Sequence, residues 1–159
     1  MQPHSLKLSP DSDLIISIKE FSFSNNLYGY VSGVVGNLSK ACIQCPGNQE
    51  ISKFQLISTW IVRQFKNDYN PIHTHGGHLS GVGYLKVPKN FGEYHQKTKV
   101  NNQNGMLTLI HGTKSFMSES TYTIEPKVGD FYFFPNYLMH TVYPFTGTDE
   151  ERRSISFNA

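Results

Sequence analysis

Short runs of alternating apolar and polar residues, each bounded by turn-forming residues, recur along this sequence. In the run from Phe54 to Val62, every second residue can lie on one buried face, which is the period of a β-strand. We predict further strands at 13–23, 82–87, 106–110, 121–124, 131–134, 141–143 and 154–157. Short strands at regular spacing with turn signals between them are typical of an all-β sandwich or barrel.

The segments between these runs are rich in turn-forming residues. We predict a turn at 67–71 and a strand that begins at His73. The polar segment 89–105 is long enough to form a mobile loop and a candidate lid over a site. Residues 24–50 are rich in Gly, Asn and Ser, and any helices are expected to be one or two short ones near the N-terminus.

The bulk properties of the chain are those of one globular domain over residues 1–159. The net charge of +2 gives no electrostatic reason to expect a nucleic-acid partner. No signal peptide or run of about 18 apolar residues is visible, so a cytoplasmic protein without a membrane span is expected. Cys42 and Cys45 lack a second C-x-x-C motif and a surrounding βαβ pattern, which favours two reduced thiols over a zinc or redox site.

His73 and His75 are two residues apart at the predicted start of a strand. Residues at this spacing in a strand point to the same face, so both imidazoles can reach one metal ion. His140, which opens a later predicted strand, is the best candidate for a third ligand. Three protein ligands leave coordination positions open for substrate and O2, as a catalytic metal requires. The alternative is that each histidine is an ordinary surface or core residue.

His78, His95 and His111 are the competing histidines. His78 is the strongest competitor, because His75 and His78 bracket Gly76 and Gly77. We expect His78 to lie outside the metal site, since a turn at the two glycines would break the strand geometry.

Arg152 and Ser154 share a face if residues 152–157 are extended, and Arg153 then points to the other face. A guanidinium binds a carboxylate through two parallel hydrogen bonds, and a nearby hydroxyl can add a third. Arg152 and Ser154 are therefore candidates for anchoring the far carboxylate of a 2-oxo diacid. Tyr84 is a third candidate, because its hydroxyl could reach the same carboxylate. The alternative interpretation is two solvated arginines and a core tyrosine.

Taken together, these segments resemble the Fe(II)/2-oxoglutarate-dependent oxygenase superfamily, and within it a group of small oxygenases of marine bacteria and phages. The resemblance covers about two thirds of the chain and depends on the order and spacing of NPIHTH (70–75), LSGVGYLKVP (79–88), GDFYFFP (129–135), His140 and RRSISFN (152–158). It implies a double-stranded β-helix, which is a cupin-like jelly roll.

The resemblance also implies roles for individual residues. His73, His75 and His140 would bind Fe(II), and Arg152, Ser154 and Tyr84 would bind 2-oxoglutarate. Most of the superfamily has a carboxylate at the position of His75, so this site would carry one negative charge less. The implied reaction is hydroxylation of a substrate by O2, with release of succinate and CO2. The sequence identifies neither the substrate nor the oligomeric state.

Two other functions remain open from the sequence. One is a three-histidine cupin-like metalloenzyme that does not use 2-oxoglutarate, and the other is a metal-free jelly-roll binding module. The environment of Arg152 separates the first alternative from an oxygenase, because only the oxygenase needs this side chain buried and facing the metal. A metal bound at His73 and His140 would exclude the second.

Overall fold

The computed structural model describes residues 7–8, 16–18, 55–93, 98 and 101–159, which form β-strands and no α-helix. The strands are β1 (Lys7–Leu8), β2 (Ile16–Ile18), β3 (Ser58–Gln64), β4 (Asn70–His73), β5 (Leu79–Lys86), β6 (Leu107–Ile110), β7 (Thr121–Ile124), β8 (Phe131–Pro135), β9 (Met139–Val142) and β10 (Arg152–Asn158). The predicted all-β class is confirmed. The helices expected within 24–50 would lie outside the described residues. Within the described ranges, no helix is long and apolar enough to cross a membrane.

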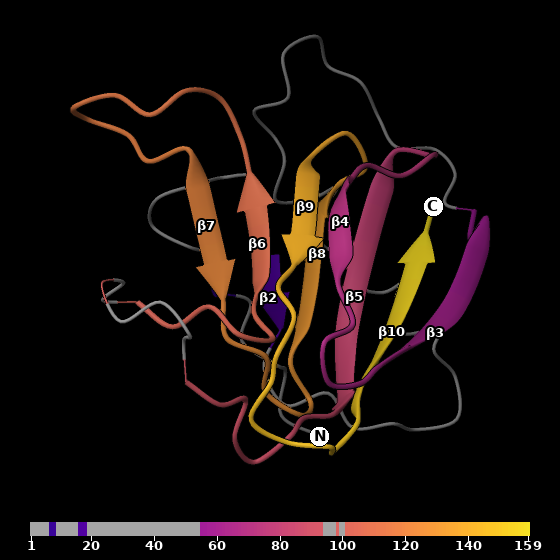
Figure 1. Cartoon of the computed structure of the whole chain (residues 1–159). Coiled ribbons are helices and arrows are strands. Elements are labelled where there is room, and N and C mark those ends of the chain that lie inside the picture. Colours follow the sequence, from indigo (N-terminus) through magenta and orange to yellow (C-terminus); the bar gives the residue numbers. More distant parts are fainter. Residues whose placement is uncertain (1–6, 9–15, 19–54, 94–97, 99–100) are drawn as a thin grey trace, which may run out of the picture.

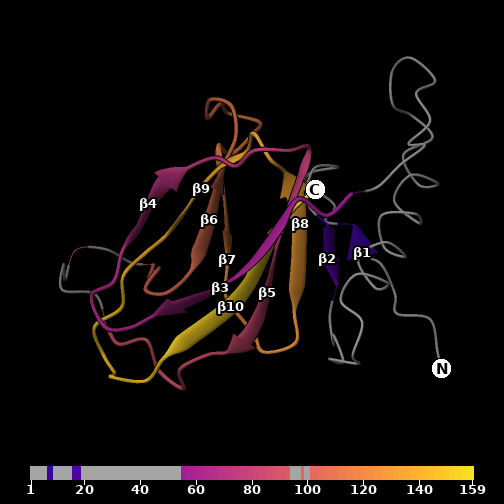
Figure 2. The same ribbon diagram turned by 90° about the vertical axis from the view of Figure 1, so that its right-hand side faces the viewer.

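Two antiparallel sheets face each other and form the predicted jelly roll (Figures 1 and 2). The large sheet has the strand order β1-β2-β8-β5-β10-β3, and the small sheet has the order β4-β9-β6-β7. β10 therefore lies between β5 and β3, although more than 60 residues separate it from β5 in the sequence. These pairings place residues from both halves of the described chain on one inner face.

The main hydrophobic core fills the space between the two sheets. Its members come from β5 and β8 on one side and from β6, β7 and β9 on the other, with Leu138 between β8 and β9. They are Val82, Tyr84, Leu107, Leu109, Ile124, Tyr132, Phe134, Leu138 and Val142. Full burial of a large apolar side chain contributes about 1.5–3 kcal/mol, so this cluster accounts for much of the cohesion between the sheets.

The opposite face of the large sheet carries a second aromatic cluster, formed by Phe131, Phe133 and Phe157. Gly81 and Gly83 on β5 make room for these rings. A β-carbon at either glycine would collide with a phenylalanine ring. Gly81 and Gly83 are therefore packing positions. The side chains of β8 alternate between this aromatic cluster and the main core, so this strand serves two apolar layers.

A tight turn after β3 carries the chain from the large sheet to the small sheet. Asp68 donates its backbone N–H to the Phe65 carbonyl, and its carboxylate accepts a hydrogen bond from the Phe65 N–H. Asn67 has a positive φ of 67°, a conformation that Asn adopts more readily than most residues. The turn predicted at 67–71 ends early, because β4 already begins at Asn70. Pro71 is tolerated there because β4 is an edge strand.

The described parts of segment 89–105 contain no strand. Asn104 is buried, and its side-chain amide lies 3.3–3.4 Å from the carbonyl oxygens of Phe91, Gly92 and Glu93. The described ends of this segment are thus fastened to each other. Its role as a lid stays a prediction.

Candidate metal centre

His73 and His140 lie directly opposite each other on paired strands. His73 is the last residue of β4, His140 is the second residue of β9, and the two are register partners. His73 thus ends a strand, whereas the sequence pattern predicted that it would begin one. Register partners in an antiparallel pair point to the same face. Both imidazoles therefore point into the space between the sheets.

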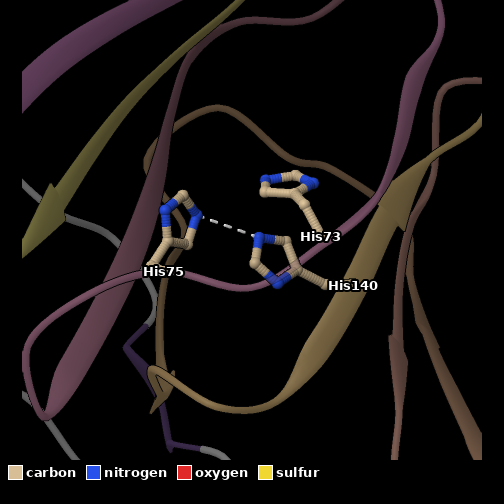
Figure 3. Close-up of side chains that lie close together, drawn as sticks. All are labelled: His73, His75 and His140. Atoms are coloured by element: carbon tan, nitrogen blue, oxygen red, sulfur yellow. Dashed lines mark hydrogen bonds between the residues drawn. The ribbon is translucent and has the colours of Figure 1, made fainter.

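His75 completes the cluster from the segment that follows β4 (Figure 3). Its Nε2 atom lies 3.1 Å from Nε2 of His140. One ligand nitrogen from each of His73, His75 and His140 can be chosen so that all lie within 4.8 Å of one another. Two imidazole nitrogens bound about 2.1 Å from one metal ion at a right angle would be about 3 Å apart. The spacing therefore suits a shared metal ion.

In His73 and His140, a backbone carbonyl group determines which ring nitrogen is free to bind a metal. Nδ1 of His73 lies 2.7 Å from the Pro71 carbonyl oxygen, and Nδ1 of His140 lies 2.9 Å from that of Leu138. A carbonyl oxygen only accepts hydrogen bonds, so each Nδ1 must carry the proton. The Nε2 lone pairs are consequently available for a metal, as in many metal-binding histidines.

The surroundings of the cluster also favour the neutral form of the imidazoles. Burial lowers the pKa of His140 to about 4. Burial, and then the proximity of His73, lower the pKa of His75 below its ordinary value. A neutral imidazole is the form that binds a metal. Near pH 7 these two histidines are therefore already in the required protonation state.

Arg152 lines the same cavity as the three histidines. Its side chain is 1% exposed, and burial lowers the pKa of its guanidinium. Within the described residues, it forms no ion pair. Nη1 donates one hydrogen bond of 3.3 Å to Oε1 of Gln64, while Nε has no hydrogen-bond partner there. A buried cation with unused donors is costly unless an anion pairs with it.

Ser154 and Tyr84 lie next to Arg152 and face each other across β10 and β5. Ser154 lines the cavity. Tyr84 is buried and lies beneath the guanidinium, whose Cζ atom is 5.1 Å from the ring centre. The Tyr84 hydroxyl has no hydrogen-bond partner among the described residues. The three proposed anchors are thus adjacent, although Tyr84 is not among the cavity-lining residues.

Arg153 lies on the outer face of the sheet, as the strand alternation predicted. Its Nε and Nη2 atoms bind the two carboxylate oxygens of Glu151 at 2.9 and 2.6 Å. Nε of Arg63 binds the same carboxylate at 2.5 Å. Arg152 therefore lies in a cavity without a carboxylate partner, whereas Arg153 on the outer face is paired with the carboxylate of Glu151.

The competing histidines do not join the cluster where they are described. His78 and His111 are exposed, and neither belongs to the group of potential ligands. His95, Cys42 and Cys45 lie outside the described residues.

Three contributors to the site were not predicted from the sequence. The Trp60 ring lies 5.3 Å from that of His75. Asn136 forms two hydrogen bonds with the backbone of His75, of 3.0 and 3.1 Å. Gln64 binds Arg152. Gln64 is in phase with Trp60 and Val62, and a polar residue on the buried face of a strand is a signal that could have identified it.

The arrangement of these residues fits a metal ion with a carboxylic acid beside it. Three imidazoles offer nitrogen ligands that suit Fe(II) among other divalent metals. The unpaired donors of Arg152 and the unpartnered hydroxyl of Tyr84 suit a carboxylate, which accepts several hydrogen bonds. The donor set and the orphaned polar atoms therefore agree with an Fe(II) ion and a diacid co-substrate.

Comparison with solved structures supports the fold. The chain is similar to HygX from Streptomyces hygroscopicus, determined with nickel and 2-oxoglutarate bound, with a TM-score of 0.53, 12% identity and coverage of 90% of this chain and 80% of that one. The chain is also similar to a 2OG-Fe(II) oxygenase family oxidoreductase from Burkholderia pseudomallei, with a TM-score of 0.49, 12% identity and coverage of 91% of this chain and 68% of that one. A third similar structure is a Pseudomonas putida prolyl-4-hydroxylase, with a TM-score of 0.45, 15% identity and coverage of 82% of this chain and 78% of that one.

Sequence comparison identifies the family. No curated protein matches the chain significantly. Residues 58–158 match the model of the family described as "Putative 2OG-Fe(II) oxygenase". The match spans every described strand from β3 to β10, and with them all three clustered histidines and Arg152. The chain therefore belongs to this family of Fe(II)- and 2-oxoglutarate-dependent oxygenases.

Proposed function

We propose that this protein is a dioxygenase that hydroxylates a substrate while converting 2-oxoglutarate and O2 to succinate and CO2. The observation that carries the proposal is the buried guanidinium of Arg152, which lines the cavity of His73, His75 and His140 without a carboxylate partner among the described residues. A cation in this position selects a co-substrate that brings its own negative charge.

The residues of the chain divide the task between two ends of the cavity. His73, His75 and His140 would hold Fe(II), which supplies the chemistry of O2 activation when it is bound. Arg152 and Ser154 would bind the far carboxylate of 2-oxoglutarate, with Tyr84 donating its hydroxyl from below. The rings of Trp60 and Phe134 contact those of His75 and His140, respectively, and would shield that side of the cluster from water.

Uncoupled turnover tests this function without knowledge of the primary substrate. The protein is reconstituted with Fe(II) under anaerobic conditions, supplied with 2-oxoglutarate and exposed to O2, and succinate is measured. We expect succinate to form in the wild type and in His78→Ala, and to fall to background in His73→Ala. Iron content, measured in parallel, should follow the same order.

The same experiment distinguishes the alternatives. Iron binding at the histidines without any binding of 2-oxoglutarate would favour a three-histidine metalloenzyme of another type. The absence of metal binding would favour a metal-free binding module. Equal iron loss in His78→Ala and His73→Ala would show that the ligand set is wrong.

A further inference from the structure

Gln64 is buried on the inner face of β3, next to the proposed carboxylate anchor. It is 4% exposed, lines the cavity and is the register partner of Arg152. Its Oε1 atom accepts a hydrogen bond of 3.3 Å from Nη1 of Arg152. Among the described residues, no carboxylate binds Arg152, and the amide of Gln64 is the side-chain group that accepts this hydrogen bond. Whatever charge lies at position 64 therefore acts directly on the guanidinium.

Two neighbours fix the orientation of the Gln64 amide, one that only accepts hydrogen bonds and one that only donates them. Nε2 donates a hydrogen bond of 2.8 Å to the backbone carbonyl of Asp68, which can only accept. Arg152 can only donate, so it requires the oxygen of the amide. The tight turn that follows β3 supplies the Asp68 carbonyl. The turn thus holds a neutral acceptor, and no anion, against Arg152.

The outer face of the same sheet offers a direct contrast. There Arg63 and Arg153 are also register partners, and the carboxylate of Glu151 binds both. On the inner face, the arginine of the next register pair meets an amide instead. Glutamate has nearly the shape of glutamine and would neutralise Arg152. The amide instead leaves the buried positive charge uncompensated.

We propose that Gln64 determines specificity through its lack of charge: a neutral side chain at this position leaves Arg152 charged, and the site therefore selects a 2-oxo diacid over a 2-oxo monoacid. The proposal rests on the proposed function, because it assumes that the co-substrate reaches Arg152. Gln64 orients the guanidinium without neutralising it, so the far carboxylate of the co-substrate completes the ion pair. A monoacid would leave that charge buried and unpaired.

Gln64→Glu tests the proposal through the ratio of two affinities, that for a 2-oxo diacid over that for a 2-oxo monoacid. The probes are 2-oxoglutarate and 2-oxopentanoate, which has the same chain length with a methyl group in place of the far carboxyl group. Binding is titrated anaerobically to the Fe(II)-loaded protein. We expect Gln64→Glu to bind 2-oxoglutarate about 10- to 100-fold more weakly, because the new carboxylate occupies the guanidinium. The affinity for 2-oxopentanoate should hold or rise, and the iron content should not change.

Two further variants separate charge from packing. Gln55 is exposed, so Gln55→Glu makes the same chemical change away from the site and should keep the wild-type ratio. Gln64→Met removes the amide but adds no charge, and we expect the preference for the diacid to remain within a few-fold of wild type. Because the two variants of Gln64 should differ, a general loss of packing cannot produce the expected result.

The possible failures are also distinct. A wild-type ratio in Gln64→Glu, or an equal loss of preference in Gln64→Met, would overturn the role of Gln64. If Gln64→Glu does not fold, Gln64→Met still tests the proposal: a kept preference for the diacid supports a neutral side chain as the sole requirement, and a lost preference overturns it. An iron-loaded wild type that binds 2-oxoglutarate no more tightly than 2-oxopentanoate would overturn the co-substrate assignment itself.

Discussion

Arg152 and Arg153 are neighbours in the sequence, but their side chains lie in opposite environments. Arg153 shares Glu151 with Arg63 on the outer face of the large sheet. Arg152 lies in the cavity with one hydrogen bond to a neutral amide. Because side chains alternate along the strand, Arg153 forms an ion pair on the outer face, whereas Arg152 is a buried cation without a carboxylate partner. The contribution of each to function should differ accordingly.

Replacement of each arginine by alanine measures this difference. Arg152→Ala should weaken the binding of 2-oxoglutarate about 10- to 100-fold, because it removes a charge-assisted hydrogen-bond donor from the cavity. Arg153→Ala should change the affinity less than about threefold, because its ion pair with Glu151 lies on the outer face of the sheet and not in the cavity. Anaerobic titration of both iron-loaded variants is the measurement. A larger loss in Arg153→Ala would mean that the assigned strand faces are reversed.

At the scale of elements, Glu151 connects the three strands at one side of the large sheet. Its carboxylate contacts Arg63 of β3 and Arg153 of β10, and Nζ of Lys86 on β5 lies 3.9 Å away. The hydrogen bonds from Arg153 and Arg63 lower the pKa of the Glu151 carboxyl to about 2. Such a group stabilises the folded state only while it is ionised, so this connection depends on pH.

The difference in unfolding free energy between wild type and Glu151→Gln should therefore vary with pH. Because the pKa is lower in the folded state, the stabilisation is complete above the unfolded pKa, which lies near 4.3. It should decline as the pH falls from about 5 towards 2. Urea unfolding of both proteins at several pH values measures it. A difference that stays constant between pH 6 and pH 3 would contradict the assignment.

The close contact between Gly83 on β5 and the ring of Phe131 predicts how substitutions of glycine affect stability. Gly83→Ala would drive a β-carbon into the Phe131 ring and should destabilise the fold by about 1–3 kcal/mol. At Gly76 an added β-carbon would have no atom within 4 Å, so Gly76→Ala should stay within about 0.5 kcal/mol of wild type. Equal thermal or urea midpoints for the two variants would contradict the packing.

The elements also show what the sequence can and cannot predict. β7 was predicted with its observed bounds, because Thr121–Ile124 alternates cleanly between two turns. β4 was misplaced, because the residues at its start favour turns and the edge position that tolerates Pro71 is a tertiary property. Gln64 was missed for a similar reason: it lies 88 positions from Arg152, and only the pairing of β3 with β10 makes them neighbours.

At the scale of the whole molecule, the site joins the two sheets. The histidines lie on or beside the strands of the small sheet, while Arg152 and Gln64 lie on the large sheet, and all of them line one cavity. Ligands that contact both sheets bind only the folded arrangement. Their binding energy therefore adds to the free energy of unfolding.

Thermal unfolding should report this coupling. A divalent metal at about 100 times its dissociation constant adds about 2.7 kcal/mol, which for a chain of this size raises Tm by about 5–10 °C. Adding 2-oxoglutarate should raise Tm further, but only when the metal is present. Chelation should reverse both shifts. His73→Ala should show neither shift, and a metal-induced rise of wild-type size in that variant would place the metal elsewhere.

The central position of β10 has a consequence for how the protein is made in the cell. The ribosome completes β10 after every other described strand, yet β10 is the strand that both β3 and β5 require as a partner. Until it emerges, the nascent chain carries two unpaired strand edges, which can associate with other chains. The inner face of the large sheet also lacks Arg152 until then. Assembly of the cavity is therefore a late event that must follow synthesis of the described region.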